Sequence, residues 1–146
     1  MIDALRNLIN EADKLCTEIE KETKAIIDAE KEVMMKRLSN YRATLREYMK
    51  MMKQANLKEF SIATNMRMRG GYGRPVYMVL YPNGCISFAE PGTYNDWARC
   101  YPSNELEVDF YDKHFEEIEK ELSKAIMNAM AKRAEKAIKE NEEVRK

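Results

Sequence analysis

The segment RMRGGYGR at positions 67–74 contains the residue types that most suggest binding. Arginine binds phosphate through two parallel hydrogen bonds, glycine lets a backbone approach a phosphate closely, and a tyrosine ring can stack on a base. The segment has no Gly-Lys-Ser/Thr and no strand-to-helix setting, so it is not a P-loop. We expect a loop in which Arg67, Arg69, Tyr72 and Arg74 contact a protein partner or, alternatively, nucleic acid. A solvated loop without a binding role is the third interpretation.

Three alternating acidic residues could bind a metal ion. Glu105, Glu107 and Asp109 would share one face of a strand, where their oxygens suit Mg²⁺ or Ca²⁺. No EF-hand spacing accompanies them, so we expect a solvated acidic face instead.

Zinc ligation and catalysis have weaker signals. Cys85, Cys100 and His114 lack the paired spacing of zinc sites, so we expect free thiols and neither a metal nor another cofactor. One histidine and no nucleophile motif indicate that the protein is not an enzyme.

Aromatic residues are concentrated in the centre of the chain, where a small sheet needs bulky side chains for its core. Trp97 is the ambiguous one, because it lies in an expected surface connection. Tryptophan is a favoured anchor at protein interfaces, so Trp97 is a further candidate for partner binding.

The elements that position these residues follow from the breakers of regular structure. All five glycines and four prolines lie within positions 70–102. The sequence therefore predicts an α+β protein, a single domain over residues 1–146. We expect a helix over 3–56, a central β region over 58–110 and a second helix over 110–142. The two helices would form a long antiparallel hairpin, like a coiled coil, with a three- or four-stranded antiparallel sheet at the turn end.

Alternation of apolar and polar residues predicts the strands. Positions 60–68 alternate, 76–81 are apolar on both faces, and 85–89 return after a three-residue hairpin loop at 82–84. Positions 105–110 alternate again and predict a fourth strand. Positions 93–100 predict one helical turn.

The first helix has an apolar residue at steps of three and four, as in a coiled coil. The stripe over residues 1–33 consists of Leu5, Leu8, Ala12, Leu15, Ile19, Glu22, Ile26, Ala29 and Val33. This helix is longer than the second one, so its N-terminal part would expose leucines to water. Either this helix breaks near Ser39 and folds back into a three-helix layer, or a second chain covers the leucines. We expect the second arrangement, a homodimer whose seam includes Leu5, Leu8, Leu15 and Ile19.

Blocks of charge indicate how the helices pair. Residues 1–33 carry a net charge of −4, residues 34–58 carry +6, residues 105–121 carry −6 and residues 122–146 carry +3. An antiparallel pair would place +6 beside −6 and −4 beside +3, and like charges would penalise other arrangements.

Composition limits the class of function. The 146 residues hold 25 basic and 25 acidic side chains, and this balance argues against a bulk polyanion binder. Three features favour a cytoplasmic protein. The three cysteines have no paired spacing for disulfides, no apolar run is long enough for a membrane span, and the N-terminal segment is too acidic for a signal peptide.

We expect a non-catalytic protein-binding module that acts through the sheet end and the adjoining helices. Small proteins of this build include inhibitors and adaptors encoded by phages and mobile elements, anti-CRISPR proteins among them. The alternatives are a nucleic-acid-binding protein that uses the 67–74 loop and a structural coiled-coil dimer.

Overall fold

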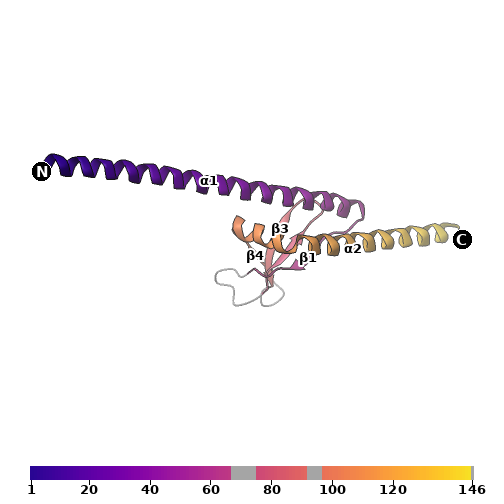
Figure 1. The fold of residues 1–146 in the computed structure, drawn as a ribbon. Helices are drawn as coiled ribbons and strands as arrows, with labels where there is room; N and C mark the ends of the chain where they lie inside the picture. The colour runs from indigo at the N-terminus through magenta and orange to yellow at the C-terminus, as the bar shows by residue number, and fades with distance from the viewer. Residues whose placement is uncertain (67–74, 92–96, 146) are drawn as a thin grey trace. The chain divides into compact units, whose positions relative to one another are not determined.

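A computed structural model of the chain describes residues 1–66, 75–91 and 97–145 (Figure 1). The elements are α1 (Ile2–Gln54), β1 (Phe60–Ala63), β2 (Tyr77–Leu80), β3 (Ile86–Pro91), β4 (Trp97–Cys100) and α2 (Asn104–Arg145). The α+β class, with two long helices and a four-stranded antiparallel sheet between them in the chain, is confirmed. No helix in the described ranges is long and apolar enough to cross a membrane.

The chain divides into two compact units, Met1–Arg37 and Leu38–Lys146. In the first unit every side chain is exposed except the half-buried Met34. The second unit contains the rest of α1, the sheet and α2. That residues 1–146 form one domain stays a prediction.

The sheet is a meander in which neighbouring strands are consecutive in the chain, in the order β1-β2-β3-β4. In the register of the central pair, Met78 lies opposite Phe88 and Leu80 opposite Ile86. The predicted hairpin loop at 82–84 is confirmed. The Tyr81 amide donates to the Cys85 carbonyl, and Gly84 has φ +90°, a conformation that favours glycine.

The core of the second unit lies between the sheet and the two helices. Its side chains are apolar and come from all three parts. The largest fully buried ones are Tyr111, Leu38, Leu45, Met49, Met52, Met78, Leu80, Ile118, Leu122 and Val76. The alternation predicted for 60–66 is present in the burial pattern, since Thr64 and Met66 are buried while Ser61, Ala63 and Asn65 are exposed. Position 68 lies outside the described residues.

The helix α1 ends in a hydrogen-bonded cap. The Leu57 amide donates to the Met52 carbonyl at 2.9 Å, and the Asn56 amide donates to the Lys53 carbonyl at 3.2 Å. Asn56 has φ 60°, the left-handed conformation with which many helices end. The predicted unbroken helix over 3–56 is thus confirmed to within two residues.

The direction of the helix pair differs from the predicted antiparallel hairpin. The Tyr41 hydroxyl donates to Asp112, and the Tyr48 hydroxyl donates to Glu119. Contact positions therefore increase together along both helices, which means that α1 and α2 run parallel where they touch. Figure 1 shows the same direction for α2 and for the part of α1 that belongs to the second unit.

The long connection explains this direction. A short turn would force α2 to run back along α1, whereas the meander of residues 55–103 returns the chain before α2 begins. The predicted contact of the +6 block with the −6 block is present in the ion pair between Arg42 and Glu107. The second charge match, of 1–33 with 122–146, joins residues of two different units and stays a prediction.

Two local predictions are wrong. Residues 105–110 form the start of α2 rather than a strand, and the Ser103 hydroxyl caps this helix by accepting from the Leu106 amide at 3.2 Å. Residues 97–100 form β4 rather than a helical turn, because they pair with β3. The rest of the predicted turn, 93–96, lies outside the described residues.

Candidate interaction surfaces

The predicted arginine segment cannot be placed. Arg67, Arg69, Tyr72 and Arg74 lie outside the described residues, so their contact with protein or nucleic acid stays a prediction. Trp97 is described and is 57% exposed at the start of β4. Its ring meets the Tyr77 ring edge-on, with 5.6 Å between centroids. One face of Trp97 is thus supported by the sheet while much of the side chain stays in water.

A hollow of about 370 Å³ lies at the opposite end of β4 from Trp97, beside Cys100 and the start of β3. Its lining includes Arg42, Arg46, Arg99 and Glu107. Arg99 also places its guanidinium 5.3 Å from the centre of the Tyr101 ring, and Tyr101 is largely exposed. Three guanidinium groups and one carboxylate leave a positive balance that suits an acidic side chain. The sequence gives no sign of the hollow, because its residues come from distant segments.

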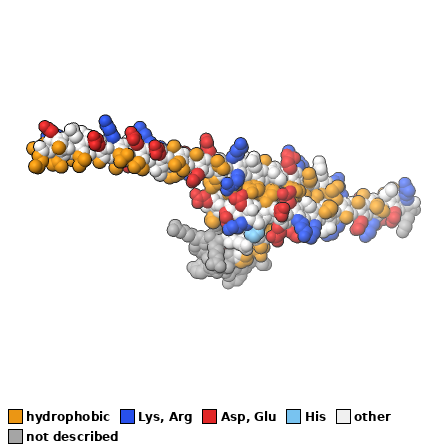
Figure 2. Space-filling view, viewed as in Figure 1, with side chains coloured by type: hydrophobic (Ala, Val, Ile, Leu, Met, Phe, Trp, Pro, Cys, Tyr) orange, Lys and Arg blue, Asp and Glu red, His pale blue; other side chains and the backbone are white. Residues whose placement is uncertain are grey.

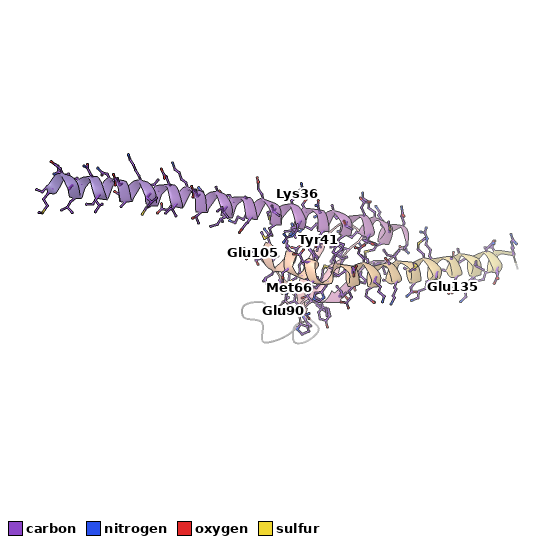
Figure 3. The ribbon with its side chains drawn as sticks, viewed as in Figure 1. Lys36, Tyr41, Met66, Glu90, Glu105 and Glu135 are labelled. Atoms are coloured by element: carbon purple, nitrogen blue, oxygen red, sulfur yellow. The ribbon has the colours of Figure 1, made fainter. Side chains whose placement is uncertain are left out.

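The acidic residues expected on one solvated strand face are divided between two environments. Glu107 is buried, and its carboxylate accepts two hydrogen bonds from the Arg42 guanidinium at 2.7 and 2.9 Å. The Tyr111 hydroxyl donates to the same carboxylate at 2.8 Å. Asp109 is exposed and pairs with Lys113, and Glu105 lies at the start of α2 (Figure 3). Glu107 therefore joins the two helices, and both of its carboxylate oxygens accept hydrogen bonds within the protein.

This cluster shifts the pKa values of its members. Burial raises the pKa of the Tyr111 phenol far above its usual value, and the nearby Glu107 carboxylate raises it further. The hydrogen bond to Glu107 raises the pKa of Arg42, against a smaller opposing effect of burial. The rings of Tyr111 and Phe115 pack on Tyr41, which lies between the helices (Figure 3). The cluster stabilises the helix pair.

The three candidate zinc ligands are not assembled into a site. Cys85 follows the hairpin loop, Cys100 ends β4, and His114 lies on α2 beside Asn65 and Glu117. Burial is the main cause that raises the pKa of the Cys100 thiol. Within the described ranges, no three histidine, cysteine, aspartate or glutamate side chains are close enough to hold a metal ion.

The predicted dimer-seam residues are all in water. Leu5, Leu8, Leu15 and Ile19 are each more than half exposed, and so are Ile26 and Val33 further along the same face. Figure 2 shows hydrophobic side chains along one side of this part of α1. We call the set Leu5, Leu8, Leu15, Ile19, Ile26 and Val33 the N-terminal stripe.

A second exposed apolar face lies near the end of α2. Its first four members recur at steps of three and four, and two further apolar residues extend the same face toward the end of the helix: Met127, Met130, Ala134, Ala137, Ile138 and Val144. We call this set the C-terminal stripe; all of its members are exposed. The sequence indicates an amphipathic alanine-rich helix here, but only the structure shows that the described residues of the second unit leave this face exposed.

The comparisons with known proteins add no assignment. No family model, no curated protein and no solved structure matches this chain.

Proposed function

We propose that this chain is a non-catalytic protein-binding module and that the N-terminal stripe is its main binding surface. The observation that carries the proposal is the exposure of six large apolar side chains along one face of a single helix. Large apolar patches of this kind mark interaction sites in soluble proteins. An inhibitor or an adaptor, as the size and build of the chain suggest, would both be forms of such a module.

The spacing of the stripe favours a helical partner. Steps of three and four place apolar side chains in a narrow seam that another helix can fill by knobs-into-holes packing. Isolated helices are marginal in water, so residues 1–33 gain stability when a partner covers the seam. Covering the seam then stabilises a helix that the single chain already forms.

The sheet end offers a second contact region to a protein partner. Trp97, Arg99 and Tyr101 are exposed and belong to the residue types that dominate interface energies. The positive hollow lined by Arg99 and Tyr101 suits an acidic side chain of that partner. These features support the proposal but do not carry it.

A capture experiment with matched variants tests the function. Leu8→Lys with Leu15→Lys places two charges in the seam, and Asn10→Lys with Thr17→Lys adds the same charge on the opposite face of the helix. Further copies of the chain are added to a nuclease-treated native lysate, so that a second copy can also be captured. We expect the parent and the opposite-face variant to retain the same bound proteins from this mixture. The seam variant should lose them.

Two results would contradict the proposal. One is a seam variant that retains every partner bound by the parent. The other is binding that disappears from all three proteins after nuclease treatment, which would assign the interaction to nucleic acid.

A further inference from the structure

The C-terminal stripe is exposed because α2 continues beyond the end of α1. The Arg133 side chain donates to the carbonyl of Gln54, the last residue of α1. Because the two helices run parallel there, α2 has no α1 beside it from about this position to Arg145. Ile126 is still buried, whereas Met130 and Ile138 are more than half exposed.

The two stripes differ in the size of their central side chains. The N-terminal stripe consists of leucine, isoleucine and valine, which project far from the helix. The C-terminal stripe has alanine at two central positions, 134 and 137, which let a second helix approach closely. Large side chains facing small ones fill space better than large ones facing large.

Charge distinguishes the possible pairings. Residues 1–33 carry −4 and residues 122–146 carry +3. Two N-terminal segments placed together would bring −4 to −4, and in parallel register they would also bring the two copies of Glu22 together in the seam. An N-terminal segment on a C-terminal segment brings opposite charges together, which favours this pairing and penalises the other.

We propose that two copies of this chain form a reciprocal dimer, in which the N-terminal stripe of each copy packs on the C-terminal stripe of the other. The dimer rests on the proposed function and names the partner of that same stripe. Each copy offers both surfaces once, so two copies related by a two-fold axis satisfy both contacts and leave neither stripe exposed.

Complementation between two variants tests this pairing. Leu8→Lys with Leu15→Lys alters only the N-terminal stripe, and Met130→Glu with Ala137→Glu alters only the C-terminal stripe. In the proposed dimer each variant alone damages both contacts, so each should sediment as a monomer. A mixture of the two keeps one contact intact and places lysines against glutamates in the other, so it should sediment as a dimer.

The expected loss for each variant alone is at least about a hundredfold in dimer affinity, and mixing should recover most of it. Asn10→Lys with Thr17→Lys should dimerise like the parent. Far-ultraviolet circular dichroism, measured at equal chain concentration, should show the same helix content in every variant. Lysine and glutamate both favour helices, so the substitutions themselves do not oppose folding.

Each contrary result has a definite meaning. A dimer formed by the Met130→Glu, Ala137→Glu variant alone would show that N-terminal stripes pair with each other and would overturn the proposal. A mixture that stays monomeric would also overturn it. A parent chain that is monomeric at about 100 µM would overturn the dimer but not the proposed function, which stands if the capture experiment finds another protein on the stripe.

Discussion

At the scale of single residues, Glu107 is the side chain that most restricts how the helices meet. It is buried on α2 and binds both Arg42 of α1 and Tyr111 one turn further along its own helix. A buried carboxylate is tolerated only when hydrogen bonds and an opposite charge compensate for lost water, and here both are present. The same contacts make Tyr111 a residue whose ionisation reports on the fold.

Replacing Tyr111 with phenylalanine should remove a pH dependence of stability. Because the pKa of Tyr111 is raised in the folded chain above its ordinary value of 10.0, the folded state holds this proton longer than the unfolded state does. The contribution is fully present below pH 10 and is lost as the pH rises above it. Relative to the Tyr111→Phe variant, the free energy of unfolding of the parent should fall by up to about 1.4 kcal/mol per pH unit above pH 10.

Urea unfolding between pH 8 and pH 11 measures this difference. Tyr101→Phe is the matched control, because Tyr101 is 75% exposed. Parallel pH curves for the parent and Tyr111→Phe would contradict the buried, carboxylate-bound environment of Tyr111.

At the scale of elements, the end of α1 depends on one backbone conformation. Asn56 has φ 60° and is followed by the amide that caps the helix. Asparagine tolerates this conformation and glycine adopts it without strain. In alanine the Cβ lies too close to the following carbonyl oxygen, which destabilises the conformation.

Substitutions at Asn56 should therefore separate by backbone strain rather than by side-chain size. We expect Asn56→Gly to lie within about 0.5 kcal/mol of the parent and Asn56→Ala to lose about 1 kcal/mol, measured by urea unfolding. An alanine variant as stable as the glycine variant would show that the cap does not fix the end of α1.

Several elements could be predicted from the sequence because their signals are long or specific. The first helix has many regular repeats, and the hairpin loop at 82–84 has proline and glycine where their conformations are needed. The start of α2 was misleading, since Glu105 to Phe110 alternates like a strand over only six residues. Two other signals favour a helix instead. One is the cap at Ser103, and the other is the apolar spacing of three and four residues at Val108, Tyr111, Phe115 and Ile118.

The direction of the helix pair could not be predicted from charge. Opposite blocks attract in either direction, so the match of 34–58 with 105–121 is compatible with a parallel pair as well as with an antiparallel one. The path of the meander decides the direction. The C-terminal stripe has the same origin, because it is exposed only when α2 runs past the end of α1. The N-terminal stripe, in contrast, could be predicted from its spacing alone.

At the scale of the whole molecule, the chain has zero net charge but an uneven distribution of charge along its length. Its two exposed apolar stripes lie in segments of opposite sign. In one chain neither stripe is buried among the described residues, and both are long enough for several turns of helix packing. A dimer that covers each stripe with the other would bury apolar surface and neutralise charge in the same contact.

Hydrogen–deuterium exchange of the backbone amides tests this central claim most directly, because it reports on both stripes separately. The comparison is between the parent and the Leu8→Lys, Leu15→Lys variant at about 100 µM, with the amides of β2 as an internal reference. We predict faster exchange in the variant not only in residues 5–33 but also in residues 127–145, because the loss of the dimer uncovers both segments. Unchanged exchange in residues 127–145 would contradict the account, because it would show that the N-terminal stripe is not bound there.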